Sequence, residues 1–320
     1  MYGEASSPLR RPKRWWSAAN RRAWKSSSRS SVFIVILVSS VRPPLYHMRA
    51  RRECPCEAIR FAGAGRAAAR LPVAPRPPIV AGMKNQYFGD INDYRKYGIL
   101  RALQAGSGLP LAVCWMLTPN DESTAGRKTG YLVEPERWRR YDREVYDVLR
   151  GSLLQNRRTI EVAAHSFLSS AVSHEDYLSR DARERARYFA DLLEKVGEPS
   201  LVFFDPDNGL GVGSKPIGTI GAERYLYLEE LAGVYGAGHS CLVYQHFPRE
   251  RRDRYTRERA SEVGTRLGAP WVATLATPHV LFILAPRREH AEALTDGLRQ
   301  VKERWSGQVD IWMHRPASGG

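Results

Sequence analysis

The 320-residue chain has little cysteine and no long apolar run, and each shortage excludes a class of protein. Four cysteines are too few for a fold built on disulfides, and they suit a reducing compartment. The longest apolar run, Val32–Val38, is far shorter than the roughly 20 residues of a membrane-spanning helix. We therefore expect a cytoplasmic protein with no membrane segment and no disulfide-linked partner. The sequence leaves its oligomeric state open.

Several common functional signatures are also missing. Residues 126–130 contain the glycine and lysine of a phosphate-binding loop, but Arg127 breaks the spacing that a nucleoside triphosphatase needs. The Gly-x-Ser-x-Gly elbow of an α/β hydrolase is absent, and we find no internal repeat. Cys54 and Cys56 have no second ligand pair at zinc spacing, so we expect unpaired thiols there.

The basic character of the chain belongs to its first quarter. The formal net charge is +15, and residues 1–82 contribute most of it, with 16 Lys and Arg against 3 Asp and Glu. Residues 83–320 hold 33 basic and 31 acidic residues. The first quarter also holds 9 of the 20 prolines, a composition that cannot bury enough apolar surface to fold. We expect a disordered leader over residues 1–82 and a single domain over residues 83–320.

Three interpretations of this leader are open. Its basic start and short apolar run resemble a targeting signal, and its charge would also suit an RNA-binding tail. The third interpretation is that Met83 is the natural start, because the composition becomes globular directly after it. We favour the third.

Beyond Met83, helical and extended patterns alternate. Apolar runs predict buried strands at residues 111–117, 200–204 and 240–245, with a weak strand at 159–163. Strands at 271–276 and 280–284 are joined by a link that only a hairpin can close. The alternation predicts an α/β fold with a Rossmann-like mixed sheet, mostly parallel with an antiparallel hairpin edge, and helices on both faces. The remaining expected elements are helices at 90–104, 134–150, 175–196, 223–235, 249–267 and 288–305, and a last strand at 309–313.

Polar clusters directly follow three of the predicted strands, at residues 118–121, 205–209 and 245–249. In a parallel sheet, ligands bind beyond the carboxyl ends of the strands, so we expect one shared site there. The carboxylates of Asp205 and Asp207 could hold Mg²⁺, and with Lys215 they would make a metal-dependent nuclease site. For His246 and His279 we expect ordinary polar contacts rather than metal binding.

The segment before the first strand, residues 84–98, is the sharpest feature of the sequence. Asp90 can cap the helix that follows, and Asp93 lies in its first turn, where negative charge is favoured. These structural roles do not explain the aromatic and amide residues of the segment. Nor do they explain why the charged Lys96 stands shortly before the apolar residues Ile99 and Leu100.

This segment and two of the polar clusters carry a resemblance. Residues 85–98, 203–209 and 244–249 look like those of a set of uncharacterised bacterial proteins that begin near Lys84. More distantly, residues 84–315 resemble the 23S ribosomal RNA adenine-N6 methyltransferases. That family has a His-x-Gly-Asn-x-x-Asp-x-x-Lys-His segment before its first strand, and residues 88–97 follow the same spacing. Its Asp-Pro-Pro-Tyr motif corresponds to residues 205–208, and its chain also ends with a hairpin, a helix and a strand.

The resemblance implies a methyltransferase-type sheet, S-adenosylmethionine as cofactor, and roles for individual residues. Lys96 corresponds to a lysine that helps to hold the methionine carboxylate. Asp205, with the Pro206 carbonyl, corresponds to the acceptor of hydrogen bonds from the target amino group, and a positioned acceptor makes that amine a better nucleophile. The catalytic assignment covers Asp205, Pro206, Asp207 and Asn208. The cofactor-binding assignment covers Asp93, Lys96, Thr118, Asn120 and Asp121.

The sequence departs from the family at two places. Asn208 replaces the tyrosine that stacks on the target base, and Asp207 replaces the second proline of the motif. The loop after the first strand has no glycine before Gly126, whereas the family has a glycine-rich loop there. A target base must be flipped or unpaired and then stacked on an aromatic ring. We therefore assign stacking and other substrate contacts to Tyr87, Phe88, Tyr244, His246, Phe247 and Arg249.

The predicted function is methyl transfer from S-adenosylmethionine to an amino group of a nucleic-acid base or a related substrate. RNA or DNA would be the partner, and no metal ion is assigned. Two alternatives remain: a Mg²⁺-dependent nuclease, and a non-catalytic binding module on the same scaffold. The basic stretch at residues 249–257 could contact phosphate, although we favour a solvated helix face there.

Overall fold

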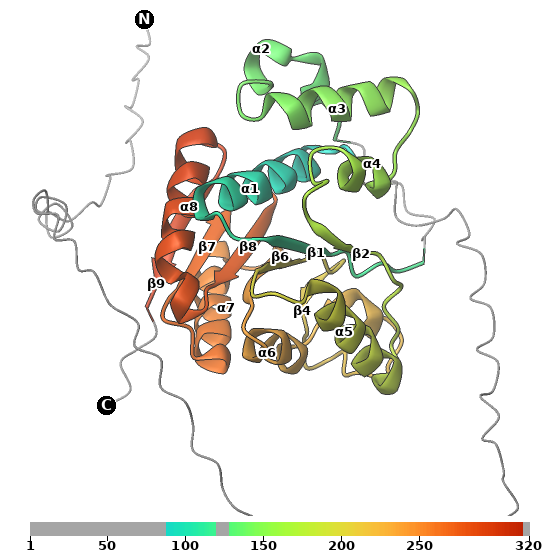
Figure 1. Cartoon of the computed structure of the whole chain (residues 1–320), viewed down its shortest axis with the longest axis vertical. Helices are drawn as coiled ribbons and strands as arrows, with labels where there is room; N and C mark the ends of the chain where they lie inside the picture. The colour runs from blue at the N-terminus through green and yellow to red at the C-terminus, as the bar shows by residue number, and fades with distance from the viewer. Residues whose placement is uncertain (1–87, 120–127, 316–320) are drawn as a thin grey trace, which may run out of the picture. The chain divides into compact units, whose positions relative to one another are not determined.

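A seven-stranded sheet lies at the centre of the computed structural model, which describes residues 88–119 and 128–315 (Figure 1). The first four strands in sheet order are parallel, the fifth is antiparallel to both of its neighbours, and the last is antiparallel to the sixth. In sheet order they are β2 (Val172–His174), β1 (Leu111–Cys114), β3 (Leu201–Phe204), β6 (Ser240–His246), β8 (Val280–Ala285), β7 (Val272–Ala276) and β9 (Asp310–His314). Two short parallel strands, β4 (Gly209–Leu210) and β5 (Tyr225–Leu226), form a second sheet.

Helices cover both faces of the large sheet (Figure 1). One layer consists of α1 (Ile91–Ser107), α2 (Pro135–Trp138), α3 (Arg143–Leu154), α4 (Ile160–His165) and α8 (Ala291–Arg304). The other consists of α5 (Ala182–Val196), α6 (Leu228–Gly236) and α7 (Arg252–Leu267). The predicted fold class, a Rossmann-like and mostly parallel mixed sheet with helices on both faces, is therefore confirmed. The β7–β8 hairpin is present, and β9 extends the sheet beyond it to form the edge.

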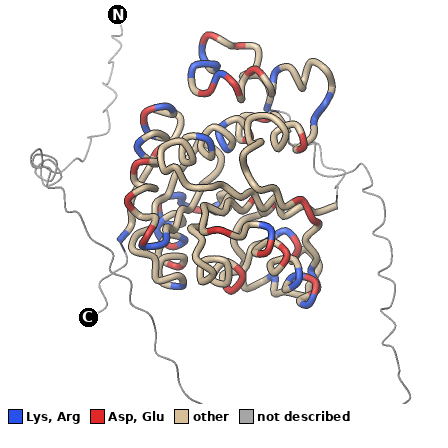
Figure 2. The backbone as a smooth tube through the Cα atoms, viewed as in Figure 1, with Lys and Arg blue, Asp and Glu red and all other residues tan. Residues whose placement is uncertain are grey.

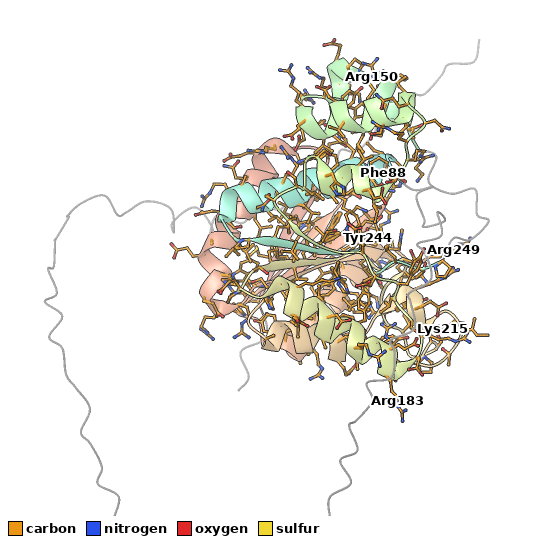
Figure 3. All side chains as sticks on the ribbon, turned by 45° about the vertical axis from the view of Figure 1, so that its right-hand side comes forward. Phe88, Arg150, Arg183, Lys215, Tyr244 and Arg249 are labelled. Atoms are coloured by element: carbon orange, nitrogen blue, oxygen red, sulfur yellow. The ribbon has the colours of Figure 1, made fainter. Side chains whose placement is uncertain are left out.

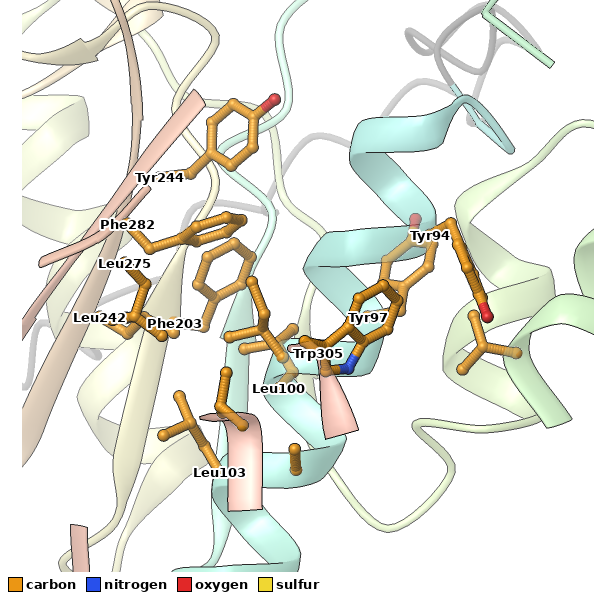
Figure 4. Close-up of a cluster of buried hydrophobic side chains, with 14 of the residues drawn as sticks. Tyr94, Tyr97, Leu100, Leu103, Phe203, Leu242, Tyr244, Leu275, Phe282 and Trp305 are labelled. Atoms are coloured by element: carbon orange, nitrogen blue, oxygen red, sulfur yellow. The ribbon is translucent and has the colours of Figure 1, made fainter. Parts of the chain in front are cut away.

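The central strands are apolar on both sides because they are covered on both sides. Along β3, Leu201 and Phe203 pack toward the α1 and α8 layer, while Val202 and Phe204 pack toward α5, α6 and α7. Figure 4 shows Phe203 beside Phe282 and Leu242 in the first of these cores. Strands β1, β3, β6 and β8 carry no Asp, Glu, Lys or Arg, and apart from Asp310 on the edge strand β9 the charged residues of the described ranges lie on the surrounding helices and loops (Figure 2).

Helix α1 begins and ends at clear signals in the sequence. The Asp90 side chain accepts hydrogen bonds from the backbone N–H groups of Asn92 and Asp93, at 2.7 and 3.0 Å. The helix ends at Gly108, whose φ of 68° is a left-handed conformation that glycine adopts without strain. Gly98 lets the helix approach α8 closely, because a Cβ there would lie 1.9 Å from the Trp305 ring. This packing holds the acidic first turn of α1 at the carboxyl ends of β1 and β3.

Several predicted helices and strands differ from the structure. The helix predicted over 223–235 begins only at Leu228, because Tyr225–Leu226 form β5, and the helix predicted over 175–196 begins at Ala182. Residues 159–163, predicted as a weak strand, lie in the start of α4, where the Thr159 hydroxyl caps the helix by accepting from Glu161 N–H. The second parallel strand is instead β2, which is only three residues long and gives no periodic signal. The helix predicted over 134–150 is divided into α2 and α3, because Asp142 caps a new helix by accepting from Val145 N–H.

The leader falls outside the described residues, and so do Cys54, Cys56 and Met83. The two cysteines that the structure describes, Cys114 and Cys241, are buried and form no disulfide. Over residues 88–119 and 128–315, each helix is too short or too polar to cross a membrane.

Candidate active site

A cleft of about 850 Å³ opens at the carboxyl ends of β1, β3 and β6. The first turn of α1 and the β7–β8 turn complete its walls, and its size suits a small-molecule or nucleotide ligand. In Figure 3, Phe88, Tyr244 and Arg249 lie on this side of the domain, while Arg150 and Arg183 lie well away from it. Twelve residues assigned from the sequence line the cleft: Phe88, Asp93, Lys96, Thr118, Asp205, Pro206, Asp207, Asn208, Tyr244, His246, Phe247 and Arg249.

Three other assigned residues, Tyr87, Asn120 and Asp121, lie outside the described residues. Lys215, which the nuclease interpretation placed beside Asp205, does not line the cleft, and its ammonium donates to the Ile220 carbonyl at 3.3 Å.

Lys96 is the centre of the cleft floor. Its Nζ lies 2.8 Å from Asp93 Oδ1 and 2.8 Å from Asp205 Oδ2, and its side chain is only 7% exposed. Burial opposes the charge on Lys96, but the carboxylates of Asp205 and Asp93 outweigh that effect and raise the pKa of Lys96 well above its ordinary value. Lys96 therefore stays protonated, and its two ion pairs link the first turn of α1 to the turn after β3.

Aromatic rings surround this buried ammonium group. Lys96 Nζ lies 5.1 Å from the ring centre of Tyr97 and 5.7 Å from those of Trp115 and Tyr244. Tyr97 is fully buried and lines the cleft, and its hydroxyl has no hydrogen-bond partner among the described residues. In Figure 4 the hydroxyl of Tyr244 points away from the apolar cluster that holds its ring. The walls thus offer flat surfaces. Among the described residues that line the cleft, two buried polar atoms have no hydrogen-bond partner: the Tyr97 hydroxyl and Asn92 Oδ1.

The first turn of α1 adds two carboxylates to the floor. Asp93 Oδ2 accepts from Gly89 N–H at 3.0 Å, while its other oxygen is paired with Lys96. Burial and the nearby Asp93 raise the pKa of Asp90 to about 6, although the cap hydrogen bonds oppose the shift. With Asp205 and Asp207 also present, the floor has more carboxylates than cations, which favours a positively charged or hydrogen-donating ligand group.

The turn after β3 is fixed from several directions. Asp205 N–H donates to the Cys114 carbonyl at 3.0 Å, and the Thr118 hydroxyl donates to Asp207 Oδ2 at 2.7 Å. Burial raises the pKa of Asp205, whereas the charge and hydrogen bond of Lys96 act in the opposite direction. No backbone N–H of the described residues donates to the Pro206 carbonyl. Asp205 and Pro206 both line the cleft, so this turn can offer it two oxygen acceptors, the Asp205 carboxylate and the Pro206 carbonyl.

Gln245 holds the other end of this turn, and the sequence reasoning assigned it no role. Its buried side-chain amide donates to the carbonyls of Asn208 and His246 at 3.2 and 3.0 Å, and its oxygen accepts from Leu210 N–H at 2.7 Å. Gly209 has a φ of 102°, and a Cβ there would lie 2.3 Å from the Gln245 amide. The only sequence feature that could have identified this role of Gln245 is its position as a polar residue near the end of an apolar strand.

The turn after β1 keeps a left-handed residue without glycine. Met116, which lines the cleft, has a φ of 47°. Non-glycine residues in this region are strained, and such strain persists where surrounding contacts enforce it, often at functional sites. The segment that lacks glycine therefore still holds a left-handed residue at the cleft, and Leu117 directly after it pairs in parallel with Tyr177.

The sequence reasoning also missed residues that only the sheet order brings to the cleft. Lys128 comes from the segment before residue 130, Arg224 from the segment before β5, and Arg252 from the start of α7. His279 lines the cleft, although we expected for it only an ordinary polar contact. Among the described residues, no group of three or more His, Cys, Asp or Glu side chains is arranged to hold a metal ion.

Comparison with known proteins adds little to this description. No family model matches the chain, and no curated protein matches it. Among solved structures, the chain is similar to a protein of family DUF519 from Legionella pneumophila, with a TM-score of 0.38 and 10% sequence identity. The alignment covers 73% of this chain and 98% of the other.

Proposed function

We propose that the cleft transfers a methyl group from S-adenosylmethionine to an amino group of a nucleic-acid base or a related substrate. One observation carries this proposal: Asp205 and Pro206 both line the cleft, and the buried ammonium of Lys96 lies 2.8 Å from the Asp205 carboxylate. The sequence resemblance assigned the same three residues to one site, and they come from segments more than 100 residues apart.

The charge and shape of the floor suit this cofactor. S-adenosylmethionine supplies an electrophilic methyl group on a positively charged sulfur, and it also carries an ammonium and a carboxylate. The carboxylates of the floor favour its positive groups. Lys96 uses two of its three N–H donors on Asp93 and Asp205, which leaves the third for a ligand carboxylate.

The acceptor amine would be oriented by the turn after β3. Asp205 Oδ2 is held by Lys96, so the position of the carboxylate is fixed, and its second oxygen is available to accept from an amino N–H. The Pro206 carbonyl supplies another acceptor. Two acceptors at one amino group would direct its lone pair toward the methyl carbon and stabilise the positive charge that develops on the nitrogen. The new N–C bond would form as the C–S bond of the cofactor breaks, which leaves S-adenosylhomocysteine, and the nitrogen would then lose one proton to the Asp205 carboxylate or to water. Tyr244 and Phe247 offer rings on which the base can stack.

The test is Asp205→Asn, which keeps the size of the side chain and one oxygen but removes the charge. We expect the transfer of labelled methyl groups to RNA, DNA or mononucleotides to fall by about 100-fold or more, while S-adenosylhomocysteine still binds. Asp310→Asn, on the exposed edge strand β9, is the matched control and should retain full activity. Methyl transfer at the wild-type rate in Asp205→Asn would refute the proposed role.

A metal-dependent nuclease has less support. One Asp205 oxygen is already bound by Lys96, and the Thr118 hydroxyl donates to Asp207. Mg²⁺-dependent cleavage of RNA or DNA that is lost in Asp205→Asn, with no methyl transfer by the wild-type protein, would favour this alternative over ours.

A further inference from the structure

The cleft is divided by charge between its floor and one side of its mouth. The carboxylates of Asp90, Asp93 and Asp205 lie on the floor around a single lysine. At the mouth are three basic residues, Lys128, Arg249 and Arg252, which we call the basic rim. Glu250 is the acidic residue that lines the cleft beside them.

Local contacts hold the basic rim at the mouth. The guanidinium of Arg252 lies 4.7 Å from the ring centre of Phe247 and donates to the Pro278 carbonyl at 2.9 Å. It therefore bridges the segment after β6 and the β7–β8 turn. Lys128 and Arg249 are exposed, and within the described ranges neither forms an ion pair with a carboxylate. By contrast, Arg254 and Arg257 on the outer surface of α7 pair with Glu258 and Asp253.

Two further features add to the positive potential here. Burial lowers the pKa of His279, and the charges of Lys128, Arg95 and Arg252 lower it further. Helix α7 begins at Arg252, so the positive end of its dipole lies at the rim, although Asp253 in its first turn offsets part of it. Cations that have no carboxylate partner within the described ranges favour an anionic group on the ligand.

We infer that the basic rim is a phosphate subsite, which binds the phosphate attached to the nucleoside whose amino group reaches Asp205. This inference rests on the proposed function, because it takes the amino group to be at the floor. The stretch at 249–257 is then not one solvated face, because Arg249 and Arg252 line the cleft while Arg254 and Arg257 do not.

The three parts of the cleft match the three parts of a nucleotide. The acceptors on the floor suit an amino group, the rings of Tyr244 and Phe247 suit a base, and the basic rim suits a phosphate. A free nucleotide and a nucleotide within a single strand both present this chemistry. A nucleoside without phosphate would lose the contacts with the rim.

The experiment is calorimetric titration of the full chain with adenosine 5′-monophosphate, adenosine and a short single-stranded oligoadenylate. We expect the monophosphate to bind about tenfold or more tightly than adenosine. The double variant Lys128→Gln/Arg249→Gln should remove most of that difference, and thermal unfolding should confirm that it remains folded. Arg254→Gln removes the same charge from the outside of α7 and should retain the preference.

Equal affinity for the monophosphate and adenosine would overturn the inference, as would a preference that survives the double variant. If S-adenosylhomocysteine binds but no adenosine ligand does, the phosphate subsite fails while the proposed cofactor site stands. If the monophosphate binds through the rim but S-adenosylhomocysteine does not bind, the subsite stands and methyl transfer fails.

Tighter binding of the oligoadenylate than of the monophosphate would identify a nucleic-acid strand as the source of the phosphate, and the reverse would identify a free nucleotide.

Discussion

At the scale of single residues, the cleft floor concentrates charge where burial makes charge costly. Lys96 is paired with the carboxylates of both Asp93 and Asp205, and Asp90 lies beside Asp93 at the start of α1. Removing ions from water is expensive, and buried ion pairs often stabilise a protein less than apolar residues of similar volume. This arrangement therefore indicates a functional site more than a stabilising one.

The pH dependence of the free energy of unfolding tests the cost of burying the charged Asp90 carboxylate. Because its pKa is about 6 in the folded protein and 3.8 ordinarily, the folded state holds the proton more tightly than the unfolded state. Its contribution to the free energy of unfolding is therefore greatest below pH 3.8 and is lost as the pH rises through 6. Asp90→Asn keeps a capping side chain without the charge, so we expect it to raise the free energy of unfolding at pH 7 by about 1–3 kcal/mol.

Urea unfolding at pH 7 and pH 4 measures this effect. The gain from Asp90→Asn should nearly disappear at pH 4, where the aspartate is already protonated. Asp181→Asn, at the exposed cap of α5, is the matched control and should change the free energy of unfolding by less than about 0.5 kcal/mol at either pH. An equal gain at both pH values would show that the charge on Asp90 is not the cause.

At the scale of elements, the position of α1 depends on its contact with α8. Gly98 faces Trp305, and Gly297 of α8 approaches Leu103 so closely that a Cβ there would lie 2.9 Å from the Leu103 carbonyl. Because α1 carries both Asp93 and Lys96, this packing sets how far these two residues lie from Asp205 in the turn after β3.

Gly98→Ala tests that packing. The new Cβ would overlap the Trp305 ring, so we expect a loss of about 1–3 kcal/mol in the free energy of unfolding. Gly151→Ala, in α3, has open space around the added Cβ and should instead gain up to about 1 kcal/mol from helix propensity. Chemical unfolding of both variants measures the difference. If Gly98→Ala were as stable as Gly151→Ala, the helices would not be in the close contact described.

Most of the elements could be predicted from the sequence because their signals are local. The apolar runs of β3 and β6 and the short link between β7 and β8 are examples. The exceptions have weak or misleading local signals. Strand β2 has three residues and depends on pairing with β1, while the start of α4 has the β-branched residues of a strand but a threonine cap.

At the scale of the whole molecule, the sheet order explains which parts of the site could be anticipated. Parallel strands β1, β3 and β6 end at the same edge, so the polar residues after each of them were expected to meet there. The cleft contains all the described residues that the methyltransferase interpretation assigned, whereas Lys215 of the nuclease interpretation lies outside it. Lys128 and His279 could not be placed in the cleft in advance, because their positions depend on tertiary packing: the Lys128 carbonyl accepts from Ile91 N–H at the start of α1, and His279 lies in the β7–β8 turn.

The most direct test of the central claim is calorimetric titration of the full chain with S-adenosylmethionine and S-adenosylhomocysteine. The account predicts dissociation constants in the micromolar range, about −8 kcal/mol of binding free energy. Lys96→Gln, shown to be folded by thermal unfolding, should bind both ligands more weakly. Absence of binding to the folded wild-type protein would contradict the account and remove the basis for methyl transfer at this cleft.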